Sequence, residues 1–250
     1  PIFNKPVCTE RQYRISRILY LVFQVLLVIL STVVIGLKAM TVIFIEDNRD
    51  TGFEFETGDP EPTVLAALPR HLYTAPAKLA LVAAAISMFV GIGHAVFVVL
   101  DWKHGKRTQA YHFRRNAMFL HFTNSILVLF SLVSISVTHR SSSHFRAGYV
   151  NFRADRPSAD DGMRYNIGTF DLETWSCELK MADGARMVAE DYGRQCHLEL
   201  AGRFVMIPFA VLGFALAGLG ISQMIVGKRT PEGERLKTED EGVEMGKFNA

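Results

Sequence analysis

Four long apolar stretches constrain this chain more than any other feature of its sequence. They hold 94 of the 250 residues and a single charged side chain, Lys38, so 51 of the 52 charged residues lie in the other 156 positions. A helix needs about 20 apolar residues to cross a bilayer, and each stretch has them. This pattern excludes a soluble domain, a disordered chain and a strongly basic nucleic-acid binder. The predicted spans are 18–45, 79–100, 117–137 and 204–226.

The placement of positive charge predicts which segments face the cytosol. Segments 1–17, 101–116 and 227–250 carry 14 Lys and Arg residues in 57 positions, against 12 in the 99 positions of 46–78 and 138–203. Cytoplasmic segments carry the excess of Lys and Arg in membrane proteins. We therefore expect a cytoplasmic N-terminus, a basic cytoplasmic loop and a disordered cytoplasmic tail, with 46–78 and 138–203 as outer loops. The first span is too long for the apolar core of a cleavable signal peptide, so we expect a signal anchor that directs the chain to the plasma membrane or secretory pathway.

The three cysteines fall on opposite sides of this topology. Cys177 and Cys196 share the second outer loop, where an oxidising compartment favours a disulfide. Such a bond closes about 20 residues and contributes about 3 kcal/mol through loop-closure entropy; two free thiols are the alternative. Cys8 lies in the cytosol ten residues before the first span, where either palmitoylation or an unmodified thiol fits.

The two outer loops differ in predicted structure. Four prolines in 46–78 predict an extended, irregular segment. In the second loop, alternation in 149–152 and a run over 164–177 predict a short sheet joined by a turn at 154–162, and the chain after Cys196 is expected to run helically into the fourth span. The predicted fold is an all-α membrane protein: a four-helix transmembrane bundle with a small disulfide-braced, partly β outer loop between spans three and four.

Small residues at helical spacing mark two faces for close helix packing. Helices in lipid gain little from apolar contact, so close approach over small side chains is the available way to pack them. The faces serve either packing within one bundle or association with a partner helix. They comprise Ala83, Ser87, Gly91 and Ala95 in the second span and Gly213, Ala217 and Gly220 in the fourth.

Polar side chains inside the spans are candidates for function because they are costly in lipid. His94 and His121 lie at similar depth near the cytoplasmic side, with Asn124 one turn further along. A pair of facing imidazoles fits haem or metal ligation, a proton relay, or plain hydrogen bonding between helices. Lys38 lies near the outer end of the first span, where its stem is expected to reach the headgroups, with a buried ion pair as the alternative.

No motif in the chain carries an enzymatic mechanism. The sequence has no P-loop (G-x-x-x-x-G-K-S/T), no H-E-x-x-H, no G-x-S-x-G and no C-x-x-C. We therefore expect a protein that is not an enzyme and has no cofactor or metal.

The region of the predicted disulfide resembles a known signature. Trp175-Ser-Cys177, followed by Cys196 and then Arg203 at the entry of a span, resembles the W…C…C…R pattern of claudin-like tetraspan proteins. The resemblance implies that Trp175 packs on an outer sheet, that the disulfide braces it and that Arg203 anchors the helix end. Claudins carry this pattern between spans one and two, whereas here it precedes span four. Four spans with cytoplasmic termini and a cysteine-bearing second loop look more like the MARVEL group.

Three hypotheses for function follow. The first is a non-enzymatic tetraspan that organises membrane domains or assembles laterally with itself or with other membrane proteins, with the lipid bilayer as its medium and no nucleic acid as partner. The second is a channel or transporter subunit whose pore forms by oligomerisation, with His121 and Asn124 lining a polar path. The third is a haem- or metal-binding redox protein that uses His94 and His121.

Overall fold

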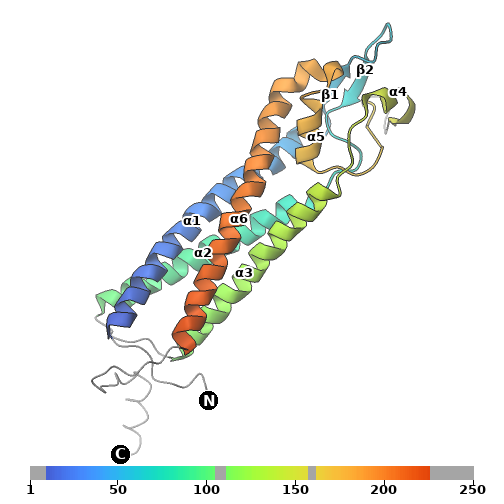
Figure 1. Cartoon of the computed structure of the whole chain (residues 1–250). Helices are drawn as coiled ribbons and strands as arrows, with labels where there is room; N and C mark the ends of the chain where they lie inside the picture. Colours follow the sequence, from blue (N-terminus) through green and yellow to red (C-terminus); the bar gives the residue numbers. More distant parts are fainter. Residues whose placement is uncertain (1–9, 105–110, 157–161, 226–250) are drawn as a thin grey trace, which may run out of the picture. The chain divides into compact units, whose positions relative to one another are not determined.

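Four long helices account for most of the chain (Figure 1). The structure is a computed structural model that describes residues 10–104, 111–156 and 162–225. Within these residues, four helices are long and apolar enough to cross a membrane, which confirms the four predicted apolar helices. Each begins before its apolar stretch, and α1, α2 and α3 also end beyond theirs, because polar residues at these ends continue the helical hydrogen bonding. They are α1 (Glu10–Asp47), α2 (Ala75–Lys103), α3 (Tyr111–Arg140) and α6 (Ala189–Ile225).

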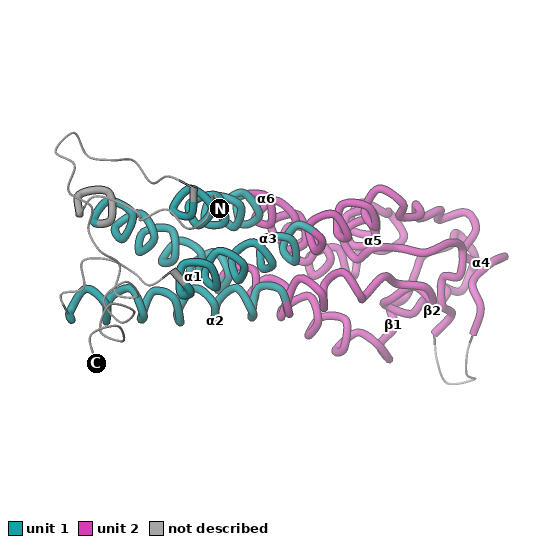
Figure 2. Tube along the Cα trace, turned by 90° about the horizontal axis from the view of Figure 1, so that it is seen from below, with its two compact units in different colours: residues 1–32, 83–129, 208–250 teal, residues 33–82, 130–207 magenta. Residues whose placement is uncertain are grey.

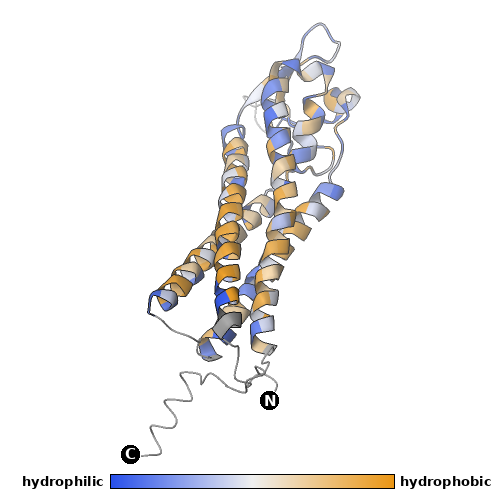
Figure 3. Ribbon diagram, turned by 60° about the vertical axis from the view of Figure 1, so that its left-hand side comes forward, coloured by the Kyte–Doolittle hydropathy of each residue, from blue (hydrophilic) through white to orange (hydrophobic). Residues whose placement is uncertain are grey.

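Apolar residues occupy much of the length of the long helices (Figure 3), and many of their large side chains are exposed. Phe89 on α2 is 70% exposed, Phe130 on α3 is 62% exposed and Val211 on α6 is 64% exposed. Large contiguous apolar surface is uncommon on soluble monomers. The exposed apolar helices are therefore consistent with a multi-pass integral membrane protein.

The chain divides into two compact units, and α1, α2, α3 and α6 each contribute to both (Figure 2). Unit 1 comprises residues 1–32, 83–129 and 208–250. Its described part is a bundle made of the four long helices. The buried side chains at its centre are mostly aliphatic or small, with two aromatic rings. They include Tyr20, Leu27, Ala84, Val98, Val128, Phe209, Leu216 and Met224.

Unit 2 comprises residues 33–82 and 130–207 and contains the segments that connect α1 to α2 and α3 to α6. Its sheet has two antiparallel strands, with Phe53 paired to Leu65 and Glu54 to Val64. The remaining elements are short helices. In chain order the elements between the long helices are β1 (Gly52–Phe55), β2 (Thr63–Ala66), η1 (Ala147–Tyr149), α4 (Val150–Arg153), α5 (Leu172–Leu179) and η2 (Asp183–Val188).

The sheet lies in the first predicted outer loop, so the prediction of an irregular segment over 46–78 was wrong. In β1, Phe53 and Phe55 are buried while Gly52 and Glu54 are exposed. This alternation is typical of a strand with one buried face. Pro60 and Pro62 lie between the strands, where their missing N–H groups remove no ladder hydrogen bond.

The prediction of a sheet within the second outer loop was also wrong. Residues 149–152 lie in η1 and α4, and the end of the 164–177 run lies in α5. Asp171 starts α5 as its N-cap, because its side chain accepts a hydrogen bond from the Thr174 amide. Among the described residues, the second loop forms only isolated bridges with β character: Leu65 with Met163, Leu72 with Phe170, and Asp155 with Arg164.

An aromatic core and a disulfide hold unit 2 together. Trp175 is fully buried, its ring lies 5.0 Å from that of Phe170, and its Nε1 donates to the Ala67 carbonyl at 3.0 Å. Cys177 of α5 and Cys196 of α6 form a disulfide, which confirms the predicted bond. Trp175 belongs to the same core as the sheet residues, although the sheet comes from the other loop. The core comprises Phe53, Phe55, Leu65, Val150, Tyr165, Phe170, Trp175, Leu179, Ala185 and Tyr192.

Candidate functional site

The two histidines predicted to lie at similar depth meet inside unit 1. His94 Nδ1 of α2 lies 2.7 Å from His121 Nε2 of α3. Gln24 Nε2 of α1 lies 2.7 Å from the first of these nitrogens and 3.0 Å from the second. All three side chains are buried. Where one of these imidazole nitrogens carries a proton and donates it to the other, the Gln24 amide nitrogen can donate only to the unprotonated one, because an amide nitrogen is a donor. The group is a hydrogen-bonded link between three helices.

This arrangement does not leave space for a haem iron between the imidazoles. Metal-to-imidazole bonds are about 2.0 Å long, so two ligands on opposite sides of one metal ion stand about 4 Å apart. His94 and His121 are in direct contact at 2.7 Å. The geometry therefore favours the hydrogen-bonding interpretation of the pair.

Asn124 is also paired within unit 1. Its Oδ1 accepts a hydrogen bond from the Ser87 hydroxyl at 2.9 Å, and both side chains are buried. Ser87 belongs to the row of small residues in the second predicted span. Its hydroxyl also bonds the Ala83 carbonyl at 2.8 Å. This position therefore combines a small side chain with a polar link from α2 to α3.

The small residues of the fourth span contact other helices of the same bundle. A Cβ added at Gly213 would stand 3.3 Å from the Ser125 hydroxyl, and one at Gly220 would stand 3.2 Å from the Met118 Cα. Ala217, between them, is 2% exposed. The face of α6 that carries these residues is therefore occupied by α3 within the chain.

Three of the four small residues of the second span are likewise covered inside unit 1. Ala83 and Gly91 are buried, whereas Ala95 is partly exposed. A Cβ added at Gly91 would stand 3.0 Å from a methyl of Val28 on α1. The close approach of α1 to α2 thus uses this glycine.

Lys38 is buried in an ion pair in unit 2, so the expectation that it reaches the headgroups was wrong. Its Nζ lies 2.7 Å from Glu199 Oε2, and Lys38 is 2% exposed. The Glu199 carboxylate also accepts hydrogen bonds from the Thr41 hydroxyl and, at 3.0 Å, from Gln195 Nε2. A buried charge is costly unless it is paired and hydrogen-bonded. These contacts satisfy the carboxylate and link α1 to α6.

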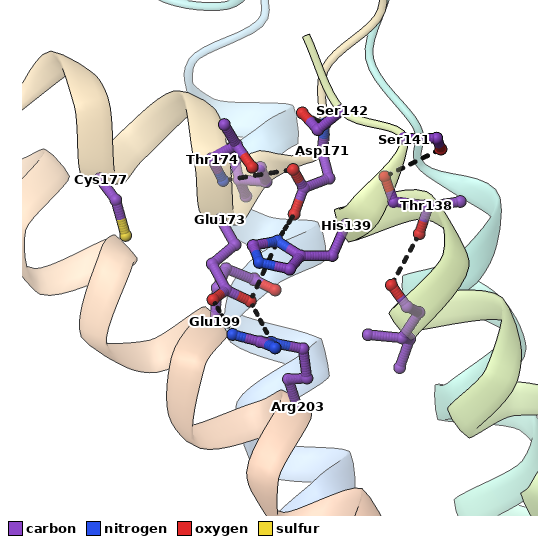
Figure 4. Close-up of polar contacts among 12 residues, drawn as sticks. Thr138, His139, Ser141, Ser142, Asp171, Glu173, Thr174, Cys177, Glu199 and Arg203 are labelled. Atoms are coloured by element: carbon purple, nitrogen blue, oxygen red, sulfur yellow. Dashed lines mark hydrogen bonds and ion pairs between the residues drawn. The ribbon is translucent and has the colours of Figure 1, made fainter. Parts of the chain in front are cut away.

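Arg203 also takes part in an ion pair rather than marking a helix end. It lies well inside α6, and its Nε and one terminal nitrogen lie 2.9 Å and 2.7 Å from the two oxygens of Glu173 on α5 (Figure 4). His139, near the end of α3, points into the same group. Its Nδ1 lies 3.0 Å from Asp171 Oδ2 and 3.8 Å from Glu173 Oε2. The cluster contains one imidazole, two carboxylates and one guanidinium.

Sequence reasoning missed the partners in both clusters of unit 2. Glu199 lies 161 residues after Lys38, and Glu173 lies 34 residues after His139. A partial signal was present for Asp171, since Asp-Leu-Glu-Thr is a typical helix start with an N-cap and an acidic first turn. Nothing in the spacing indicated that His139 would join it.

The prediction for Cys8 and that for the tail 227–250 fall outside the described residues, as does the central part of the basic loop 101–116. The remaining predicted site residues are all described. The structure brings together His94 with His121, Ser87 with Asn124, and Cys177 with Cys196.

Comparison of the chain with protein-family models, with curated proteins and with solved structures found no match. The resemblance to claudin-like and MARVEL proteins therefore stays an expectation from the sequence.

Proposed function

We propose that the chain is a non-enzymatic, multi-pass membrane protein that organises a membrane region by lateral assembly with itself or with other membrane proteins. The observation that carries the proposal is a disulfide-braced unit 2 that exposes large apolar side chains. Phe152 of α4 is 84% exposed, Met181 after α5 is 79% exposed and Met187 of η2 is 69% exposed. Exposed apolar side chains on a well-packed body are suited to contact with a partner.

The small-residue faces of α2 and α6 are not the proposed contact surface. Gly91, Gly213 and Gly220 are buried against other helices of the same chain. They have no free surface to offer a partner helix. We infer that the connecting segments in unit 2, together with the exposed apolar helix surfaces, make the lateral contacts.

The topology proposed with this function has both termini in the cytosol. The disulfide supports it, because disulfides persist in oxidising compartments. The excess of Lys and Arg in the segments assigned to the inside supports the same orientation. On this topology unit 2 carries the outer loops.

The pore hypothesis receives less support from the polar groups that suggested it. Asn124 is 4% exposed and His121 is 1% exposed, and both are hydrogen-bonded inside unit 1. A pore formed between copies is lined by outward-facing side chains. These two residues do not face outward, and the contact between His94 and His121 likewise weakens the haem hypothesis.

The experiment compares the assembly of variants in native membranes. Phe152→Ser and Met181→Ser remove exposed apolar side chains, and Arg153→Ser is the matched control at a neighbouring exposed position on α4. Membranes are crosslinked, solubilised mildly and analysed on native gels, and the purified chain is sized in lipid nanodiscs. Burying a large apolar side chain is worth about 1.5–3 kcal/mol, so we expect about a tenfold loss of the assembled species in at least one serine variant.

The control variant should assemble like the wild type. A wild-type chain that stays single in native membranes and in nanodiscs at all concentrations contradicts the proposal. Assembly that is unchanged in both serine variants contradicts the assignment of the contact to unit 2.

A further inference from the structure

The cluster at the junction of α3 and α5 has the composition of a metal site. We propose that His139, Asp171 and Glu173 bind a divalent cation of the zinc class. Each residue offers one ligand atom, and the three atoms lie within 4.8 Å of one another (Figure 4). All three residues belong to unit 2. The site is independent of the proposed lateral assembly.

The chemical types of the three ligand atoms indicate which metal ion the site prefers. One imidazole nitrogen and two carboxylate oxygens suit Zn²⁺, which takes nitrogen, sulfur and oxygen ligands, better than Ca²⁺ or Mg²⁺, which prefer oxygen alone. Zinc sites with three protein ligands keep a fourth position for water. The His139 side chain is 30% exposed, which leaves one side of the cluster open to solvent.

The two distances from His139 are close to those of a tetrahedral ion. With bonds of about 2.0–2.1 Å, two ligands of a tetrahedral zinc stand about 3.3–3.4 Å apart. The His139 Nδ1 lies 3.0 Å from Asp171 Oδ2 and 3.8 Å from Glu173 Oε2. The third pair, formed by the ligand atoms of Asp171 and Glu173, lies within 4.8 Å, so these two carboxylates must approach each other by up to about 1.5 Å for all three atoms to reach bonding distance from one ion.

Neighbouring groups hold both carboxylates in place. Arg203 bonds both oxygens of Glu173, and the interaction with Oε1 at 2.7 Å can persist while Oε2 binds the ion. Asp171 accepts from the Thr174 amide through Oδ1 at 3.3 Å, which leaves Oδ2 for the ion. Partners of this kind orient metal ligands and tune their affinity.

The charge of the cluster favours a cation. Asp171 and Glu173 bring two negative charges against the single positive charge of Arg203, and the side chains of both acids are at most 13% exposed. This excess negative charge would stabilise a divalent cation bound by His139, Asp171 and Glu173. His139 lies two residues beyond the predicted end of the third span at 137 and close to the end of α3 at Arg140.

The test measures zinc binding to the full chain, purified without a histidine tag under non-reducing conditions. His139→Gln removes the imidazole but keeps a side chain that can hydrogen-bond the carboxylates. Asp171→Asn removes the charge but keeps a good N-cap for α5. We expect one zinc per wild-type chain by equilibrium dialysis with elemental analysis, and at least a tenfold weaker affinity in each variant.

The matched control is His144→Gln. His144 Nδ1 lies 2.5 Å from Glu178 Oε1, so it forms a similar histidine–carboxylate contact with only one acid. This variant should bind zinc as the wild type does. Co²⁺ substituted for zinc should give the visible absorption of a tetrahedral site in the wild type and the control only.

Three results overturn the proposal. They are a wild-type chain without stoichiometric zinc, a folded His139→Gln or Asp171→Asn variant that binds as tightly as the wild type, and an equal loss in the His144→Gln control. Thermal unfolding of each variant in detergent identifies those that are folded. If the assembly experiment contradicts the proposed function, this test is unaffected, because zinc binding is measured on the purified chain by itself.

Discussion

Lys38 illustrates how a single residue depends on a partner far away in the sequence. As the one charge in four apolar stretches, it is expected from the sequence to reach the membrane surface. The structure instead pairs it with Glu199, and Gly202 leaves room for it: a Cβ at that position would stand 3.1 Å from the Lys38 Nζ. The sequence places a charge in the span, but only tertiary packing brings the acid to it.

Removal of Lys38 should destabilise the chain strongly. Lys38→Met leaves the buried Glu199 carboxylate without its cation, a change that costs about 3–5 kcal/mol. Adding Glu199→Gln should recover much of this loss, because the amide carries no charge and still bonds Thr41 or Gln195. Unfolding in mixed detergent micelles measures both effects.

The matched control is Lys78→Met, which removes an exposed lysine from α2. It should change the free energy of unfolding by less than about 0.5 kcal/mol. Equal stability of Lys38→Met and Lys78→Met shows that the ion pair contributes nothing. A double variant less stable than Lys38→Met assigns the stability to the neutral hydrogen bonds alone.

At the scale of elements, the apolar stretches predicted the long helices well. The short helices and strands depend instead on capping residues and on the alternation of buried and exposed side chains. Asp171 caps α5, and that helix carries Trp175 into the core. The strands β1 and β2 pair with each other because alternation buries Phe53 and Phe55 on one face. Proline density in the first loop suggested irregular structure, yet two of its prolines fall in the turn between the strands.

Two glycines of α2 give a direct test of helix packing. Gly91 lies against α1, whereas a Cβ at the exposed Gly93 meets nothing within 4 Å. Gly91→Leu should destabilise unit 1 by about 1–3 kcal/mol through overpacking. Gly93→Leu should be neutral or stabilising, since leucine favours the helix over glycine by up to about 1 kcal/mol.

Thermal unfolding of both variants in the same detergent checks this pair. If both substitutions cost the same, Gly91 does not mark a close contact between α1 and α2. If Gly91→Leu leaves stability unchanged but alters the size of assemblies, the face belongs to a partner helix, as the second interpretation of the sequence holds.

At the scale of the whole molecule, charge and cysteine placement predict the sidedness of the chain. The disulfide joins Cys177 to Cys196, and both lie in a segment with fewer basic residues per position than the segments assigned to the cytosol. Both features predict that the segments between α1 and α2 and between α3 and α6 lie outside. The same topology predicts that Cys8 faces the cytosol.

This orientation in the membrane can be tested by labelling cysteines with a membrane-impermeant maleimide. Glu61→Cys in a Cys8→Ser background places one thiol on an exposed position of the first predicted outer loop, and we expect it to label in intact cells. Cys8 of the wild type should label only after the membrane is permeabilised. The reverse pattern contradicts the proposed topology, and labelling of wild-type Cys8 in neither condition indicates a modified thiol.

The sequence alone determined the number of apolar helices, their approximate extents and the cysteine pair, because these depend on local composition and on a count of thiols. Only the tertiary structure decided where the sheet lies and which polar groups meet. Glu199 reaches Lys38, and Glu173 reaches Arg203 and His139, through contacts between helices that are distant in the chain. A buried polar group needs a hydrogen-bond or ion-pair partner. The sequence shows which polar residues lie in the spans, but only the packing of the helices decides which partner each one meets.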